Sequence, residues 1–265
     1  MGSNQNNFLM LSTMAAYDVT VATLLLEGEP GCGKSYFARA FSKYWGAELF
    51  FTQCYTGFGE EKLLLDFDPA LMADAISARG TASGREALKQ GILTRGLLAS
   101  KQGRVVIVLD ELDKSNPSTD AFLLSFLQDC EINDPILGNI KGSRENLVVL
   151  CTSNGNRDFE DALSRRWVNI QMEFPTPDEM KAILNAMMPN QRHLVGHAVS
   201  FLYSYRKLGC QKTLVQNEIV RFVEVCSRLP KSVAVQVATS LITPHKGDAE
   251  KAAKLISNFL SQVCK

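Results

Sequence analysis

The stretch of sequence that decides the fold reads Gly28-Glu29-Pro30-Gly31-Cys32-Gly33-Lys34-Ser35. Its fixed positions match the pattern G-x-x-x-x-G-K-[ST], which is typical of a loop that binds phosphate groups. An aliphatic run at Val21–Leu26 precedes the loop, and a segment with helical spacing, Lys34–Trp45, follows it. Because a strand, a glycine-rich loop and a helix stand here in the required order, we prefer a phosphate site to a glycine turn without function.

The residue types of this loop suit ATP and Mg²⁺. Glycines allow successive backbone N–H groups to face a phosphate, and the N-terminus of the following helix adds partial positive charge. We predict that Lys34 reaches the β- and γ-phosphates and that the hydroxyl of Ser35 is a ligand of Mg²⁺. The other residues predicted to contact the nucleotide are Gly28, Glu29, Pro30, Gly31, Cys32 and Gly33.

A second signal lies about 75 residues further on, where the apolar run Val105–Leu109 ends in Asp110 and Glu111. A buried strand that carries two adjacent carboxylates at its tip has the form of a Walker B element. Asp110 is then expected to hold Mg²⁺ through water, and Glu111 to activate the attacking water as general base. The next two charged residues, Asp113 and Lys114, are expected to form a solvated surface pair.

A third polar strand end follows the run Leu147–Thr152. Asn154 stands there, and strand packing should put its amide beside the tip of the Walker B strand, where it can orient the water or touch the γ-phosphate. Two adjacent arginines, Arg165 and Arg166, come shortly afterwards. They are either ordinary surface charge or catalytic cations, and their place after Asn154 favours the second reading.

The chain separates into two parts at Pro175-Thr176-Pro177. Before these prolines, strands alternate with helices, which predicts an α/β fold with a doubly wound parallel sheet in residues 1–175. The expected strands are 21–26, 48–53, 105–109, 147–152 and 169–174, and the expected helices are 34–45, 60–78, 85–100 and 118–127. After the prolines only helical patterns occur, which predicts a small all-α domain in residues 176–265. Its expected helices are 178–188, 192–207, 214–228, 231–241 and 249–263.

Composition limits the function classes further. Lys and Arg together number 28, as do Asp and Glu, so the overall charge gives no indication of a nucleic-acid partner. The part after Pro175 does carry an excess of basic residues. Seven cysteines without a C-x-x-C motif suggest free thiols in a reducing compartment. The apolar segments near the start are too short and interrupted for a membrane span, so we expect a cytoplasmic protein.

These motifs together resemble the AAA+ ATPases, and within them the MoxR branch, including its CoxD-type members. The likeness covers about residues 20–175 well and the remainder loosely. It rests on Leu25-Leu-Glu-Gly-Glu-Pro-Gly-Cys-Gly-Lys-Ser35, Gln53-Cys-Tyr-Thr-Gly-Phe-Gly-Glu-Glu-Lys-Leu63, Leu109-Asp-Glu-Leu-Asp113, Ala121-Phe-Leu-Leu124, Thr152-Ser-Asn154 and Asp161-Ala-Leu-Ser-Arg-Arg166. The resemblance implies a P-loop AAA+ core followed by a helical lid domain.

By the same resemblance, Asn154 is similar to sensor 1, and Arg165 and Arg166 are similar to arginine fingers that act on the ATP of a neighbouring subunit. A ring, usually a hexamer, is therefore implied, and we expect its assembly to depend on nucleotide. An insertion near Phe58–Arg79 and a hairpin near Glu131–Lys141 are also implied. Tyr55 and Phe58 either form a pore loop or anchor their loop to the core.

The sequence departs from the family pattern at the second sensor, where the family has an arginine at the start of a late lid helix. Leu229-Pro230-Lys231-Ser232 stands there, and Lys231 is either a cation for the γ-phosphate or a solvated helix-start lysine. The resemblance implies a remodelling or assembly chaperone that acts on a client protein, with a von Willebrand factor A-domain protein as a possible partner. The alternatives are a nucleic-acid motor or clamp loader, and a P-loop kinase for a small molecule.

Overall fold

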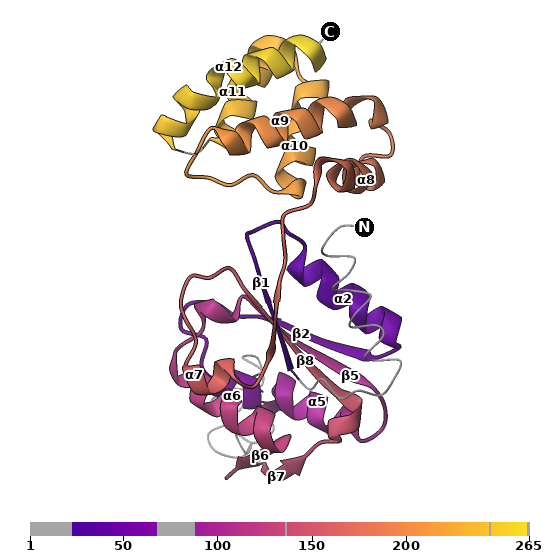
Figure 1. Cartoon of the computed structure of the whole chain (residues 1–265), viewed down its shortest axis with the longest axis vertical. Helices are drawn as coiled ribbons and strands as arrows, with labels where there is room; N and C mark the ends of the chain where they lie inside the picture. The colour runs from indigo at the N-terminus through magenta and orange to yellow at the C-terminus, as the bar shows by residue number, and fades with distance from the viewer. Residues whose placement is uncertain (1–22, 68–87, 136, 244, 264–265) are drawn as a thin grey trace, which may run out of the picture. The chain divides into compact units, whose positions relative to one another are not determined.

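The computed structural model of the chain describes residues 23–67, 88–135, 137–243 and 245–263. The chain forms two compact units. The first runs to Glu173, without residues 30–32 of the glycine-rich loop, and the second takes in those three residues and the chain from Phe174 onward. Figure 1 shows strands and helices in the first unit and helices in the second.

The first unit is built on a parallel sheet of five strands, in the order β2-β5-β8-β1-β9. The strands are β1 (Thr23–Glu27), β2 (Glu48–Gln53), β5 (Val105–Asp110), β8 (Leu147–Ser153) and β9 (Val168–Gln171). In register, Glu27 lies opposite Ser153, and Gln53 lies opposite Asp110. All strands therefore end at one edge, and β8 lies between the strand that leads into the glycine-rich loop and the strand that ends in carboxylates.

The strands agree with the predicted segments except near their ends. β1 continues to Glu27, one residue beyond its predicted end, and residues 21 and 22 lie outside the described residues. β9 was expected at 169–174 but spans Val168–Gln171, because its partner β1 ends at Glu27, opposite Gln171. A strand needs a neighbour to satisfy its backbone groups, so pairing rather than hydrophobicity sets this end.

Helices cover both faces of the sheet. α2 (Lys34–Trp45) packs against β2, β5 and β8 and buries Phe37 and Phe41. On the other face, α5 (Ile92–Ser100) and α6 (Ser118–Asp129) enclose a core with the sheet. The sheet residues in that core include Leu25, Ile107, Leu109, Val149 and Cys151. Alternate residues of the strands thus pack to opposite sides, as the period of two requires.

One predicted helix is wrong in its length. The helix expected at 60–78 is α3 (Glu60–Leu64), and a short strand, β3 (Leu65–Phe67), follows it directly. The helix expected at 85–100 is likewise preceded by β4 (Leu88–Gln90), which pairs antiparallel with β3, and begins only at Ile92 as α5. Residues 68–87, which include most of the implied insertion, lie outside the described residues.

Gly91 explains why the helix begins where it does. Its N–H donates to the carbonyl of Leu64 at 2.7 Å, so the end of β4 lies close against the chain that enters β3. A Cβ at Gly91 would stand 2.4 Å from the carbonyl oxygen of Leu63. The close approach of two backbones requires glycine here and separates the ribbon from α5.

The predicted hairpin between α6 and β8 is confirmed. It consists of β6 (Glu131–Asp134) and β7 (Gly138–Lys141), with Ile132 opposite Ile140 and both buried. Gly138 has a φ of 75°, which favours glycine at the turn. The carboxylate of Asp134 accepts a hydrogen bond from the N–H of Leu137 at 2.8 Å and closes the turn.

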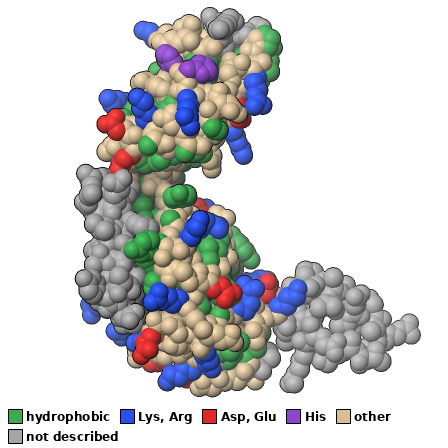
Figure 2. Space-filling model, turned by 90° about the vertical axis from the view of Figure 1, so that its right-hand side faces the viewer, with side chains coloured by type: hydrophobic (Ala, Val, Ile, Leu, Met, Phe, Trp, Pro, Cys, Tyr) green, Lys and Arg blue, Asp and Glu red, His purple; other side chains and the backbone are tan. Residues whose placement is uncertain are grey.

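The second unit is the predicted small helical domain. Its helices are α8 (Pro177–Met187), α9 (Val195–Lys207), α10 (Gln216–Arg228), α11 (Lys231–Ile242) and α12 (Lys246–Val263). α8 starts with a capping box between Thr176 and Glu179 and a proline at its first position. In the core of the unit, the rings of Phe201 and Phe222 stack, and Phe259 meets Phe201 edge to face and Phe222 at a tilt. On the face drawn in Figure 2, the described Lys and Arg side chains of this unit are spread out rather than joined in one patch.

Two further predictions concern the chain as a whole. Across the described ranges, no helix combines the length and the apolar character that crossing a membrane requires. Six cysteines fall within these ranges, and they carry thiols rather than disulfides. The fold is therefore an α/β doubly wound core followed by a helical domain, as the sequence predicts.

Candidate active site

The glycine-rich loop connects β1 to α2. Gly33 caps α2 with a φ of 98°, a value that an L-residue adopts only with strain. No acidic residue stands in the first turn of α2, and Lys34 is its first residue. The loop therefore joins backbone N–H groups, a helix N-terminus and a lysine, which together suit an anion.

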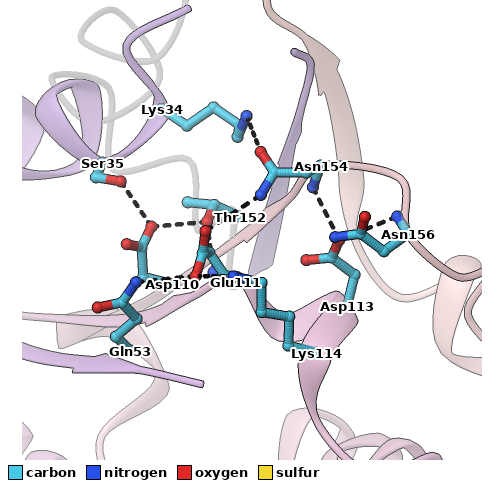
Figure 3. A network of polar contacts seen from close by, with 10 residues as sticks. All are labelled: Lys34, Ser35, Gln53, Asp110, Glu111, Asp113, Lys114, Thr152, Asn154 and Asn156. Atoms are coloured by element: carbon cyan, nitrogen blue, oxygen red, sulfur yellow. Dashed lines mark hydrogen bonds and ion pairs between the residues drawn. The ribbon is translucent and has the colours of Figure 1, made fainter. Parts of the chain in front are cut away.

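The ammonium of Lys34 lies over this loop. The side chain is buried, and Nζ donates to the carbonyl oxygens of Gly28 at 2.6 Å and Glu29 at 3.1 Å. It also donates to Oδ1 of Asn154 at 2.8 Å, which ties the loop to the end of β8 (Figure 3). The charge is thus held at the sheet edge where the polar strand ends meet.

Ser35 and Asp110 meet next to Lys34, although 75 residues separate them in the chain. The hydroxyl of Ser35 donates to Oδ1 of Asp110 at 2.7 Å, and the hydroxyl of Thr152 donates to the same oxygen at 2.7 Å (Figure 3). Asp110 is buried. A carboxylate and a hydroxyl are hard oxygen donors, which are the protein ligands that Mg²⁺ accepts beside phosphate oxygens and water.

Glu111 follows Asp110 with a left-handed backbone, at a φ of 55°. Such a conformation is unfavourable for a residue with a side chain, and it turns the carboxylate out of the strand direction. The N–H of Glu111 donates to the Thr152 hydroxyl at 2.8 Å, which fixes the turn. Oε2 accepts hydrogen bonds from Gln53 and Lys114, each at 2.8 Å (Figure 3). The surroundings therefore hold the Glu111 carboxylate in one position.

Charge and hydrogen bonds keep Glu111 ionised. Burial acts to raise the pKa of its carboxyl group, but hydrogen bonds from Lys114 and Gln53, the charge of Lys114 and the amide of Asn154 outweigh burial. The pKa of Glu111 consequently lies below its ordinary value. A group in the carboxylate form can accept a proton, as a general base must.

Asn154 connects the two sides of the site. Its Oδ1 accepts from Lys34, and its Nδ2 donates to Oε1 of Glu111 at 3.3 Å. The Asn154 amide thus links the ammonium of Lys34 to the carboxylate of Glu111, which follows β5. This position follows from the strand order, because β8 lies between β1 and β5.

The prediction for Asp113 is wrong. The side chain is buried rather than solvated, and Oδ2 accepts from the N–H of Asn154 at 3.1 Å and from the N–H of Asn156 at 3.0 Å. The amide of Asn156 donates to it as well, at 2.6 Å. The short η2 helix (Leu112–Lys114) turns Asp113 inward, where it holds the loop after β8. Lys114 is partly exposed as expected, but its partner is Glu111 and not Asp113.

The two arginines lie apart from this network. They follow the short helix α7 (Asp161–Ser164), and both are exposed. Nη2 of Arg166 donates to Oε1 of Gln128 at 3.2 Å, on α6. Within one chain, the described hydrogen bonds do not bring Arg165 or Arg166 to Lys34, Asp110 or Glu111.

Two other candidates are placed only in part. Lys231 is the first residue of α11, as predicted, but its side chain lies outside the described part of the chain, so its role stays a prediction. Of the aromatic pair, Phe58 is buried and Tyr55 is 53% exposed, with their rings edge to face at 5.4 Å. Phe58 therefore anchors its loop to the core, and only Tyr55 is available for contacts outside it.

Several residues of the site were not predicted from the sequence. Gln53 and Thr152 stand in segments that resemble the family but were given no role, Asn156 stands in none of these segments, and Asp113 was assigned to the surface. Gln53 and Thr152 share a signal that was available, because each stands at or near the C-terminal end of a strand of the parallel sheet. Ligand-binding residues of such sheets gather at that edge.

Comparisons with known proteins assign the first unit to a family. The family model described as AAA domain (dynein-related subfamily) matches residues 23–167, more than half of the chain. A Lon protease from Campylobacter jejuni is 29% identical over 173 residues. That match covers 63% of this chain but only 20% of the protease, so the matched part spans one fifth of that protein's length.

Two solved structures are similar over most of the chain. One is described as a putative ATPase from Cytophaga hutchinsonii, with 12% identity, a TM-score of 0.49 and coverage of 96% of this chain and 89% of the other. The second is a point mutant of RuvB from Thermotoga maritima, with 12% identity, a TM-score of 0.46 and coverage of 98% and 87%. The matched family model, rather than these distant likenesses, carries the assignment to a family.

Proposed function

This chain belongs to the AAA domain family, in its dynein-related subfamily, and from that membership we propose that it hydrolyses Mg²⁺-ATP as a subunit of a ring. The family is one of ATPases, so membership implies nucleotide binding and ATP hydrolysis in general. One observation carries the finer proposal. The side chains of Lys34, Asp110, Glu111 and Asn154 meet at the edge of the sheet beside the glycine-rich loop.

Binding is the task of the glycine-rich loop and its neighbours. The backbone N–H groups of Gly28–Gly33, apart from Pro30, would surround the phosphates, and Lys34 would exchange its carbonyl partners for phosphate oxygens. Ser35 and Asp110 fit Mg²⁺, which would neutralise phosphate charge when bound. The Ser35 hydroxyl and the Asp110 carboxylate already lie 2.7 Å apart, so little rearrangement is required.

Hydrolysis is the task of Glu111 and Asn154. Glu111 would accept a proton from the attacking water, and Asn154 would orient that water or touch the γ-phosphate. The Asn154 amide donates a hydrogen bond to Glu111, so the two side chains lie in contact and could act on the same water. The remaining requirement is a cation for the charge that develops on the γ-phosphate.

We propose that Arg165 and Arg166 of a neighbouring subunit supply this cation. Both side chains are exposed on the first unit, where a second copy can reach them. The sequence motifs resemble the MoxR branch, so we propose a hexameric ring whose assembly depends on nucleotide. Such rings couple hydrolysis to remodelling or assembly of a client protein in the cytoplasm, and we propose a von Willebrand factor A-domain protein as partner.

Mixing two inactive variants tests the shared site. A subunit with Lys34→Ala lacks the cation for its own ATP but still carries both arginines. A subunit with Arg165→Ala and Arg166→Ala binds ATP but offers no finger. Each variant alone should be inactive, with a loss of about 10³–10⁵ in rate for the arginine variant by analogy with other phosphoryl-transfer enzymes. The mixture should regain turnover wherever an intact loop faces intact arginines.

The mixed assemblies must first be verified by native mass spectrometry. If they form and no activity returns, hydrolysis does not depend on a neighbour's arginines. Normal turnover by the double arginine variant would give the same answer. A matched control is Arg228→Ala, which removes an exposed arginine from α10 and should leave turnover unchanged.

The client requires a separate experiment. Glu111→Gln should hold ATP without hydrolysing it and so keep a client bound. Comparing proteins that co-purify with Glu111→Gln and with Lys34→Ala separates nucleotide-dependent partners from background. DNA that stimulates turnover, or the absence of any nucleotide-dependent protein partner, would contradict the chaperone proposal.

A further inference from the structure

An ion pair between a buried aspartate and a partly buried arginine joins α6 to the loop that follows β8. Arg157 and Asp120 meet through two hydrogen bonds, Nη1 to Oδ2 at 2.8 Å and Nη2 to Oδ1 at 2.7 Å. The Asp120 side chain is 1% exposed and that of Arg157 is 19% exposed. The two parallel bonds form the bidentate arrangement that fixes a guanidinium in orientation as well as in distance.

The same carboxylate holds the start of α7. The N–H of Glu160 donates to Oδ2 of Asp120 at 3.4 Å, and Glu160 is the residue that caps α7. The carbonyl of Glu160 in turn accepts from the N–H of Ser164, the last residue of the helix. Asp120 therefore fixes both the arginine three residues before the cap and the cap itself.

An aromatic contact holds the other end of α7. The guanidinium of Arg157 lies 4.7 Å from the ring centre of Phe159, and Phe159 meets Trp167 edge to face at 5.1 Å. Trp167 is buried and follows Arg166 directly. The helix and the two arginines after it thus lie between the contact of Glu160 with Asp120 and that of Trp167 with Phe159, and Arg157 touches both Asp120 and Phe159.

Stability alone does not explain this pair. A buried ion pair often stabilises a fold no more than apolar side chains of the same size would. Arg157 also leaves its Nε buried without a hydrogen-bond partner in the described part of the chain, which is unfavourable. What the pair supplies is a fixed geometry, because the planar fork of arginine accepts one orientation.

The loop between Asn154 and α7 could in principle be positioned for the sake of Asn154. Asp113 already holds the backbone N–H groups of Asn154 and Asn156, from a different element. The contacts of Asp120 begin after that point, at Arg157 and Glu160. Asp113 therefore holds the first part of the loop, and Asp120 holds the second part, which leads to the arginines.

We propose that the Asp120–Arg157 pair is a positioning device for Arg165 and Arg166, which sets where they stand for the nucleotide of a neighbouring subunit. The inference rests on the proposed function, since it assumes that these arginines act on a neighbour. Asp120 and Arg157 then touch no substrate themselves. They act through α7, so removing the pair should displace the arginine finger of the subunit that carries the substitution and of no other subunit.

Arg157→Lys is the most informative variant, because it keeps the charge and removes the fork. The variant should bind ATP like the wild type, and homogeneous assemblies should lose about 10²-fold in kcat, as is usual for a displacement near 1 Å of a catalytic group. The KM for ATP should change little. Asp120→Asn is a second variant with the same shape and without the charge, and it should show the same split between kcat and KM.

Mixing distinguishes a positioning role for the arginines from a general structural one. Arg157→Lys subunits keep an intact loop, Glu111 and Asn154, and Lys34→Ala subunits supply intact arginines in an intact setting. Their mixed assemblies should regain turnover. If Arg157 served its own subunit's Asn154, or only stability, the Lys34→Ala neighbour could not restore activity.

The mixture of Lys34→Ala with the double arginine variant is the reference for this test. If the reference regains activity and the Arg157→Lys mixture does not, the positioning inference is overturned while the shared site stands. If neither regains activity, the proposed function itself is wrong. Wild-type kcat in both Arg157→Lys and Asp120→Asn would also overturn the inference. Arg228→Lys, an exposed arginine on α10, is the matched control for the substitution.

Discussion

Two regions of the first unit carry the predicted chemistry, and they differ in how far the chain completes them. At the edge of the sheet, Asn154 bonds to Lys34 and Glu111, and Thr152 links Asp110 to the backbone of Glu111. Lys34 and Asp110 are buried, and Glu111 and Asn154 are half-buried. Beside α7, both arginines are exposed, and the side chain of Arg166 donates a hydrogen bond to Gln128.

The difference indicates which steps a single chain can perform. The first region contains a cation, a carboxylate with a hydroxyl, a second carboxylate and an amide, which under the proposed function would bind ATP and activate water. In the second region, Arg165 and Arg166 present positive charge at the surface of the first unit. Changes in the first region should therefore affect the subunit that carries them, whereas changes in the second should affect its neighbour.

Lys34→Ala should break the first region most completely. ATP affinity should fall at least about a hundredfold, because a hydrogen bond to a charged group contributes about 1.5–3 kcal/mol and Lys34 would meet more than one phosphate oxygen. Isothermal titration calorimetry measures the loss. Lys43→Ala, an exposed lysine of the same helix, is the matched control. An unchanged affinity would mean that the loop is not the nucleotide site.

Glu111→Gln should separate binding from hydrolysis in the same region. The amide has the shape of the carboxylate but cannot accept a proton, so turnover should fall about 10²–10⁴-fold. ATP affinity should stay within a few-fold of the wild type. Phosphate release under saturating ATP measures the first quantity and calorimetry the second. Turnover near the wild-type rate would remove Glu111 from the mechanism.

Asn154→Ala should have a smaller effect on the same step. A positioned polar group of this kind contributes about 10²-fold to the rate in comparable sites. Binding should weaken only slightly, since Lys34 and the backbone N–H groups of the loop would still meet the phosphates. The test is a KM and kcat measurement on the purified variant, with Asn146→Ala on the 3₁₀ helix η3 (Arg144–Asn146) as control. A change confined to KM would assign Asn154 to binding instead.

Lys114→Met should sharpen the comparison by altering only the pH dependence of the first region. Lys114 supplies the largest influence that lowers the pKa of Glu111, so its removal should raise that pKa. Glu111 acts as a carboxylate, and activity is lost as the pH falls through its pKa. The acid limb of the pH–rate profile should therefore move to higher pH, while the rate on the alkaline side of the profile changes little.

The matched control for this prediction is Lys101→Met, an exposed lysine after α5. The acid limb should stay in place in the control. If it also stays in place in Lys114→Met, the ion pair with Glu111 does not tune the base. A shift to lower pH would contradict the sign of the effect.

A site residue could be predicted from the sequence only where a motif or the adjoining residues indicated its role. Lys34 and Ser35 stand at fixed positions of a motif, and Glu111 follows an apolar strand, so their places were recognisable. Asp113 was not, because two charged residues in succession after a strand suggest a solvated surface. The η2 turn reverses that expectation by directing Asp113 inward to the backbone of Asn154 and Asn156.

The secondary structure shows the same limit. The strand β5 was recognisable at Val105–Leu109 because all of these residues are aliphatic, and the structure extends it to Asp110. The helix expected at 60–78 is wrong in its length because α3 ends at Leu64, where the backbone of Gly91 packs against it. Gly91 lies 27 residues further along the chain, so the residues near Leu64 do not indicate this contact. Propensity acts locally, while such a contact depends on where the chain returns.

The sequence by itself determined the class of this protein, since a glycine-rich loop, an acidic strand end and the change to helices after Pro175 depend on neighbouring residues alone. Only the tertiary structure decided how the polar residues are connected. The order β2-β5-β8-β1-β9 sets β8 between the lysine and the base, so that one amide reaches both. It also decided that Asp120 and Arg157 meet beside the arginines, because residues 37 positions apart come together only once α6 and the loop after β8 pack against each other.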